Sequence, residues 1–184
     1  IRERLVALAG EDASSLVQLN TAMMDTGFML RVEEGVRVET PIEIIFVGGL
    51  TARPVAYSPR NLIVLEQGAE ATVVKHHAGM GVGAYFANSV TDIDIGPGAQ
   101  LRHYKVQAEA KEATHIDTVR VRVARDATYE SFSLSMGGRL SRNEVVVRLE
   151  GEGAHCAING AYLMRGNEHC DNTTVTEHLA PHTT

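Results

Sequence analysis

The sequence predicts an all-β solenoid, a parallel β-helix with one short helix at its N-terminal end. Beyond Phe28 the apolar residues alternate with polar ones, as they do in half-buried strands. Four segments also repeat one pattern of strand, tight corner and strand, with corners at Gly68-Ala69, Gly98-Ala99, Asp126-Ala127 and Gly153-Ala154. The corners at 68, 98, 126 and 153 are separated by steps of 30, 28 and 27 residues. A near-constant period of this size indicates stacked units, none of which buries its apolar face alone.

The one convincing helix precedes this repeat. Ser14 or Ser15 is a suitable N-cap, because a hydroxyl accepts hydrogen bonds from the free amides of the first turn. Residues at helical spacing follow, and they are Leu16, Leu19, Asn20 and Met23. Gly27 is the predicted C-terminal stop. We therefore expect residues 1–27 to be the end of an N-terminal helical region and residues 28–184 to be the β-helix core.

Equivalent positions of the repeat share a chemical character. The third position after each corner is mostly apolar, with Ala71, Leu101, Tyr129 and Cys156. The next position is mostly polar, with Thr72, Arg102, Glu130 and Ala157. Before the corner, Leu65, Ile95 and Val123 align, whereas residues 150–152 lengthen the fourth corner by one residue. This alternation predicts strands with one buried face and one wet face, and Gly35 is a candidate for an earlier, more degenerate corner.

An antiparallel sandwich is the alternative fold, because it also consists of short strands joined by regular turns. A sandwich would not be expected to keep the same corner chemistry at the same position of each repeat. The repeat therefore favours the solenoid.

Composition limits the classes of function. The chain has 184 residues, of which 44% are hydrophobic and 22% charged, as is typical of a folded domain. A net charge of −6 with interleaved signs argues against nucleic-acid binding. No apolar run approaches the roughly 20 residues that cross a bilayer. Two cysteines beside eight histidines suit a reducing compartment, so we expect a cytoplasmic protein. The start at Ile1 and the end at Thr184 predict a part of a longer protein.

Two functions follow from the predicted fold. The ends of a solenoid present unpaired amides and carbonyls, which favours the binding of a partner chain by strand pairing. The alternative is a carbohydrate-active parallel β-helix enzyme, which would need two carboxylates roughly 5 to 9.5 Å apart in a groove. Asp92 and Asp94 share one face of a strand and are the candidates, although outward strand positions are often charged in any case.

Histidines and cysteines give weak candidates for a metal site, namely Cys156, Cys170, His169 and His182. Imidazole and thiolate both bind zinc or iron. Neighbouring strand residues point to opposite faces, so His155 and Cys156 cannot easily bind the same metal ion. The same holds for His169 and Cys170. Cys156 also falls in the apolar column, where a small buried hydrophobe is expected. A stand-alone metal-binding protein remains an open alternative.

The other histidines predict no catalytic centre. His76-His77 end a strand before a glycine-rich segment that lacks the Gly-Lys-Ser/Thr of a phosphate-binding loop. His103 shares a column with Val73, Ser131 and Ile158, which predicts a hydrogen-bonded core histidine. No serine–histidine–acid spacing stands out. We therefore expect no enzyme.

Several longer segments resemble the SufB/SufD family of iron–sulfur cluster assembly proteins. They are residues 60–66, 129–135, 138–143, 149–153, 159–163 and 169–173. The resemblance extends from about Leu19 to Thr184, and the segments around Tyr129 and Arg139 are more similar to the SufD branch than to the SufB branch.

The resemblance implies a right-handed parallel β-helix core and a non-catalytic scaffold role. It implies a cytoplasmic complex with a SufB-like paralogue and a SufC-like ATPase, or a homodimer formed through the β-helix. A transient iron–sulfur cluster would belong to the full complex, with no cofactor bound by this chain. Thr183 stands where the family usually has a cysteine after Pro181-His182. We expect the family's later cysteine motif and its C-terminal helical domain to lie beyond Thr184.

Overall fold

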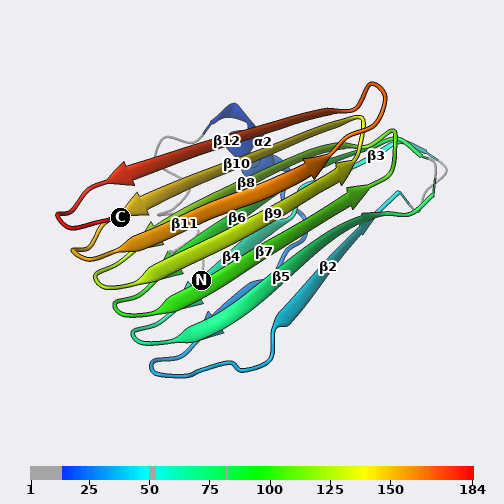
Figure 1. Ribbon diagram of the computed structural model, residues 1–184. Coiled ribbons are helices and arrows are strands. Elements are labelled where there is room, and N and C mark those ends of the chain that lie inside the picture. The colour runs from blue at the N-terminus through cyan, green and yellow to red at the C-terminus, as the bar shows by residue number, and fades with distance from the viewer. Residues whose placement is uncertain (1–13, 50–52, 82) are drawn as a thin grey trace.

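The structure, a computed structural model, describes residues 14–49, 53–81 and 83–184. The chain winds as a right-handed coil that passes alternately between two parallel sheets (Figure 1). In order, the first sheet contains β1 (Met29–Val32), β4 (Arg60–Leu65), β6 (Tyr85–Ile95), β8 (Thr114–Val123), β10 (Leu140–Leu149) and β12 (His169–His178), with β3 (Val55–Tyr57) also paired to β6. The second contains β11 (His155–Leu163), β9 (Thr128–Gly137), β7 (Gln100–Glu109), β5 (Glu70–Gly79) and β2 (Ile42–Gly48). The predicted parallel β-helix is confirmed, and the antiparallel sandwich is wrong.

The predicted corners lie one above another along one edge of the coil. They are Gly35, Gly68, Gly98, Asp126 and Gly153, and all have left-handed backbone, with φ between 56° and 72°. The first four corner amides each donate a hydrogen bond of 2.9 Å to a carbonyl of the next corner along the chain. Glycine is favoured there because it has no Cβ to oppose positive φ. Gly35 is therefore a genuine corner.

The strand register confirms the predicted columns. Ala71 pairs with Leu101, Leu101 with Tyr129, and Tyr129 with Cys156. On the other sheet the column Leu65, Ile95 and Val123 continues into Leu149. These side chains belong to one apolar core between the sheets.

The fourth corner absorbs its extra residue without moving the strands. The amides of Glu150 and Gly151 both donate to the carbonyl of Val123, at 2.9 and 3.3 Å. Leu149 therefore stays opposite Val123, although the following turn is longer than in the earlier coils.

The predicted helix is present as α2 (Ser15–Met23), which packs on the outer face of the first sheet (Figure 1). Ser14 occupies the N-cap position, but its side chain makes no capping hydrogen bond. The helix ends four residues before Gly27, so Gly27 is not its stop. A Cβ on Gly27 would lie 1.9 Å from the carbonyl oxygen of Arg60, so glycine is needed there for a close backbone approach to β4. Within the described ranges no helix is long and apolar enough to span a membrane.

The helix docks mainly through hydrogen bonds. Val17 and Asn20 are its buried residues, whereas Leu19 and Met23 are exposed. The Asn20 amide donates to the carbonyls of Pro59 and Asn88, at 3.1 and 2.7 Å. The helical spacing of apolar residues correctly predicted a helix but not the face that is buried.

Replacing Gly98 with alanine tests the corner geometry. A Cβ at Gly98 would meet no atom within 4 Å, so the substitution isolates the cost of left-handed backbone at φ +67°. Gly98→Ala is expected to lower the free energy of unfolding by about 1 to 2 kcal/mol, measured by urea denaturation. Asp126→Gly, at the equivalent corner, relieves the same strain and is expected to cause no such loss. Equal losses in the two variants would contradict this account of the corners.

Candidate functional site: a polar core inside the coil

The coil interior becomes polar towards the end of the strands that lies away from the corners. Along β5 the inward-facing residue Val73 is followed two positions later by Lys75, and along β7 the inward-facing His103 is followed by Lys105. The opposite strand β8 contributes Asp117, two residues before the core residue Val119. Because side chains alternate between faces along a strand, these residues are inward-facing in the same way as the apolar residues next to them. Lys75 and Asp117 are 0% exposed, and Lys105 is 4% exposed.

Asp117 binds both lysines. Its carboxylate lies 3.3 Å from the Lys75 ammonium and 3.1 Å from the Lys105 ammonium. Lys75 also donates to Thr91 Oγ1 at 2.9 Å, and Lys105 donates to Asn143 Oδ1 at 2.7 Å. The network therefore joins two strands of the second sheet to three strands of the first across the interior.

Burial and charge act in opposite directions on these groups. Burial alone would raise the pKa of Asp117, but the ammonium groups of Lys105 and Lys75 hold this pKa well below its usual range. Burial, the largest cause, lowers the pKa of Lys75 although Asp117 opposes the shift. A carboxylate between two buried lysines stays ionised, and it is the acceptor on which both cations depend.

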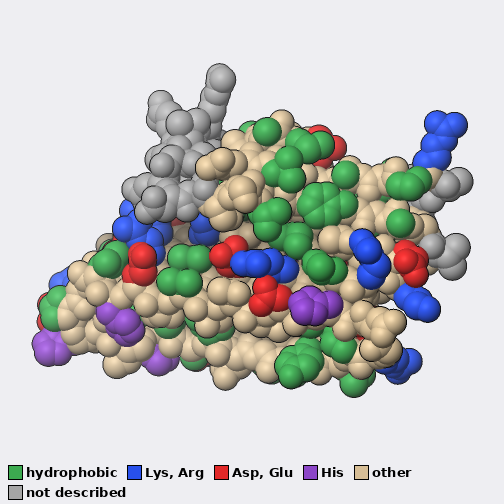
Figure 2. All heavy atoms as spheres, turned by 90° about the horizontal axis from the view of Figure 1, so that it is seen from above, with side chains coloured by type: hydrophobic (Ala, Val, Ile, Leu, Met, Phe, Trp, Pro, Cys, Tyr) green, Lys and Arg blue, Asp and Glu red, His purple; other side chains and the backbone are tan. Residues whose placement is uncertain are grey.

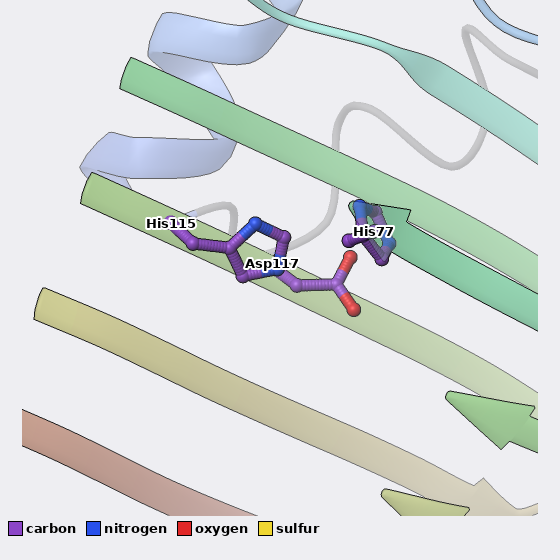
Figure 3. Close-up of side chains that lie close together, drawn as sticks. All are labelled: His77, His115 and Asp117. Atoms are coloured by element: carbon purple, nitrogen blue, oxygen red, sulfur yellow. The ribbon is translucent and has the colours of Figure 1, made fainter. Parts of the chain in front are cut away.

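Two histidines lie beside Asp117 (Figure 3). His77 is on β5 and His115 is on β8, and their ring centroids are 4.6 Å apart. The His77 ring also stacks on Phe46 at 4.8 Å. Burial lowers the pKa of both histidines, so both imidazoles are neutral near pH 7. Within the described residues, ligand atoms of His77, His115 and Asp117 all lie within 4.8 Å of one another.

His115 also has a carboxylate behind it. Its Nδ1 lies 2.9 Å from Glu109 Oε1. Tyr85 donates its hydroxyl hydrogen to the other oxygen of Glu109 and accepts a hydrogen bond from the Ala110 amide at 3.2 Å. This chain of contacts fixes Glu109 between a phenol and an imidazole. Glu109 is also one of the residues that line an open crevice of about 760 Å³, together with Gly137 and Arg139.

A second polar cluster lies beneath α2, on the outer face of the first sheet. Arg60 Nη2 lies 2.8 Å from Asp92 Oδ2, and Arg120 Nη2 lies 2.6 Å from Oδ1. Arg60 also donates to Thr21 Oγ1 of the helix at 3.1 Å. Asp92, the first of the two predicted carboxylates, is 0% exposed and binds Arg60, which in turn contacts the helix.

The outer surface carries charges of both signs, and many of them pair between neighbouring coils. Figure 2 shows acidic and basic side chains interspersed on the face seen from above. Cross-coil pairs on exposed strand positions include Arg31–Glu66, Arg102–Glu130, Arg122–Glu150 and Arg148–Glu177. Such exposed pairs each contribute little to stability.

Comparison with known proteins identifies the coil. A family model described as the SufBD core domain of the SUF system for FeS cluster assembly matches residues 49–184. The chain belongs to this family. It is 28% identical over 170 residues to the iron–sulfur cluster assembly protein SufD of Escherichia coli and 26% identical over 186 residues to SufB of Bacillus subtilis. An iron–sulfur cluster assembly SufBD family protein of Synechocystis is 22% identical over 192 residues.

The matches cover nearly all of this chain but less than half of each relative. They include 90%, 99% and 98% of the chain for SufD, SufB and the Synechocystis protein, respectively. They include 40%, 39% and 42% of those relatives. The predicted membership of the SufB/SufD family, close to SufD, is confirmed.

The four predicted metal candidates of this SufBD core lie at the last coil. Cys156 lies in the inward column, and its amide donates to Thr184 O at 2.8 Å. Cys170, on β12, accepts a hydrogen bond from Asn172 at 3.3 Å. His169 is exposed on the same strand, and His182 lies 4.0 Å from Glu152. Over the described ranges, they join no group of three ligand side chains. A ligand role for them stays a prediction.

The polar core of the SufBD coil was not predicted from the sequence. Lys75, Lys105, Asp117 and His115 were not singled out, and His77 was considered only as the end of a strand. The strand period nevertheless indicated it, because every second residue of a strand faces inward. Counting in steps of two leads from Ala71 to Lys75 and His77 along one strand, and from Leu101 to Lys105 along the next. His103 behaves as predicted, since it is buried and its Nδ1 lies 3.1 Å from the Tyr129 hydroxyl.

Neutralising Asp117 tests the ion network. Asp117→Asn leaves two buried ammonium groups without a counter-charge and is expected to lower the free energy of unfolding by about 3 to 5 kcal/mol. Glu130→Gln removes the exposed pair with Arg102 and is the matched control, with an expected loss of less than about 1 kcal/mol. Urea denaturation of both variants gives the comparison. Similar losses would show that Asp117 is not the acceptor on which the lysines depend.

The buried histidines predict a loss of stability in mild acid. Burial lowers the pKa of His103 to about 3 in the folded protein, whereas its unfolded value is about 6.5. Its contribution is therefore fully present above pH 6.5 and is lost as the pH falls towards 3, by up to about 1.4 kcal/mol per pH unit. His103→Gln is expected to make the decline in unfolding free energy between pH 7.5 and pH 5 shallower by about one proton's slope, measured by urea denaturation at each pH. An unchanged slope would contradict a neutral, buried His103.

Proposed function

We propose that this chain is the core of a non-catalytic scaffold subunit in a SufBCD-type iron–sulfur cluster assembly complex. The subunit pairs with a SufB-like paralogue and with a SufC-like ATPase. The observation that carries the proposal is the match of the SufBD core-domain model to residues 49–184, which include β3 to β12 of the coil. The relatives named SufD and SufB are more than twice as long as the matched region, so partners are proposed for the longer protein.

The arrangement of carboxylates supports a role without catalysis. The rival carbohydrate-active enzyme needs two acidic side chains that reach a substrate. Asp92 cannot serve as one of them, because it is fully buried between Arg60 and Arg120. Asp117 and Glu109 are likewise enclosed and bound to lysine, histidine or tyrosine within the coil.

The coil suits a subunit whose contribution is positional. Parallel strands in one register, with side chains in columns, form a body that moves as a unit. We propose that this body holds the partner surface and couples ATP-driven movement of the SufC-like subunit to exposure of a site shared with the SufB-like subunit. The iron–sulfur cluster is then the cargo of the complex. The two free cysteines suit a cytoplasmic setting for this assembly.

Co-expression tests the proposal. The full protein, carrying an affinity tag, is co-expressed with a SufB-like paralogue and a SufC-like ATPase, and the purified material is analysed by size-exclusion chromatography with light scattering. A complex that contains all three chains is the expected result. Protein limited to residues 1–184 is expected to keep the pairing with the paralogue and to lose the ATPase, since the resemblance assigns ATPase binding to C-terminal helices.

Two outcomes would count against the scaffold role. Failure of the full protein to bind either partner would remove the proposed complex. Turnover of polyuronides or other polysaccharides by the purified protein would favour the β-helix enzyme instead. A homodimer that dissociates when the paralogue is added remains consistent with the proposal, because the same surface would serve both pairings.

A further inference from the structure

The polar core contains a group of side chains that the assembly role does not use. His77 on β5 faces His115 and Asp117 on β8, and Figure 3 shows the Asp117 carboxylate lying close to the His77 ring. We propose that His77, His115 and Asp117 bind one divalent transition-metal ion, such as Zn²⁺ or Fe²⁺, inside the coil. The site is independent of the proposed partners, because all three ligands come from this chain.

The donor set fits such an ion. Two imidazoles and one carboxylate are a common protein ligand set for zinc and for non-haem iron(II), with one or more positions left open. Metal–ligand bonds of about 2.0 to 2.2 Å place two ligands of one ion no more than about 4.4 Å apart. The three ligand atoms lie within 4.8 Å of one another, so small side-chain rotations are enough to close the site.

His77 supplies the second, independent observation. It is 1% exposed, and neither of its ring nitrogens has a hydrogen-bond partner. Phe46 covers one face of the ring, but an aromatic face offers no partner to the nitrogens at its edge. An unsatisfied buried polar group costs about 1 to 3 kcal/mol, so its retention needs a compensating role. A metal ion between His77 and Asp117 would satisfy one of these nitrogens.

His115 is oriented as a metal ligand is. Its Nδ1 lies 2.9 Å from Glu109 Oε1 without the angle of a hydrogen bond, and its Nε2 is buried without a hydrogen-bond partner. A carboxylate on one imidazole nitrogen, with the other nitrogen free for a metal, is the usual outer arrangement of a histidine ligand. Tyr85 holds Glu109 in place from the opposite side.

Glu109 also lies between the site and an open crevice. It is one of the residues that line the open crevice of about 760 Å³ between the loops at the end of the coil away from the corners. The Glu109 side chain is itself 0% exposed, and its Oε1 lies 2.9 Å from His115 Nδ1.

The two lysines compete with the ion for Asp117. Their ammonium groups lie 3.3 and 3.1 Å from its carboxylate, and without an ion the charges of Lys75, Lys105, Asp117 and Glu109 sum to zero. A dication must displace at least one ammonium from Asp117, and this competition weakens its binding. This competition gives the site a property that a purely structural histidine pair would lack, since removing a lysine strengthens metal binding.

Metal titration tests the site. Chelator-treated protein carrying His169→Ala and Cys170→Ser, which removes two of the four candidate ligands at the last coil, is titrated with Zn²⁺ by calorimetry and with Co²⁺ by its visible absorption. One ion per chain is expected. His77→Asn and His115→Asn are each expected to weaken binding by about a hundredfold, and Glu109→Gln by about tenfold. His103→Gln, at a buried histidine outside the group, is the matched control and is expected to leave the affinity unchanged.

Lys75→Met keeps the proposal testable even where a histidine variant fails to fold. Removing this ammonium is expected to raise the affinity for Zn²⁺ by about tenfold. No binding to the parent protein, equal affinities in the His77→Asn and His103→Gln variants, or no gain in Lys75→Met would each overturn the site. Co²⁺ bands that are lost in His115→Asn and retained in His103→Gln would support it.

Discussion

The first four corners are joined one to the next by a backbone hydrogen bond that the corner amide donates, and together with the parallel strand ladders these bonds hold the coils in register. These amides are available because the backbone turns through the left-handed region at Gly35, Gly68, Gly98 and Asp126. The strands between the corners then pair in parallel without offset, so that equivalent side chains lie above one another. Since a strand's side chains alternate with a period of two, a slip of one residue would exchange inward and outward faces throughout a coil. Both the apolar core and the polar network depend on this register.

The interior is divided by chemistry along the strand direction. Near the corners the columns are small or aliphatic, and Ala69, Ala99, Ala127 and Ala154 are all 0% exposed. Farther from the corners, the inward-facing positions of the same strands are occupied by lysine, histidine and aspartate. Burying these charges is costly, and the cost is offset only where each charge meets an opposite one with further hydrogen bonds. Asp117, with two lysines and their Thr91 and Asn143 partners, meets that condition, whereas the neutral ring of His77 has no hydrogen-bond partner at all.

The sequence was sufficient to predict the features that repeat. Corners, columns and the solenoid follow from a period near 28 residues, and the family follows from longer motifs. Features that occur once were harder to predict. The helix was located, but its buried face depends on the amide of Asn20 reaching two carbonyls on other strands, which no helical periodicity reports. Lysine is rarely buried, so nothing near Lys75 in the sequence marks it as an inward residue, and only its distant partner Asp117 explains its burial.

The lengthened fourth corner has a consequence for how such chains can vary over evolution. The turn at Glu150 and Gly151 accommodates one additional residue while Leu149 remains opposite Val123, so a residue added at this corner leaves the strand register unchanged. The same change within a strand would invert the orientation of every later side chain in that coil. Length differences that leave the fold intact are therefore expected in the turns between strands and not within the strands.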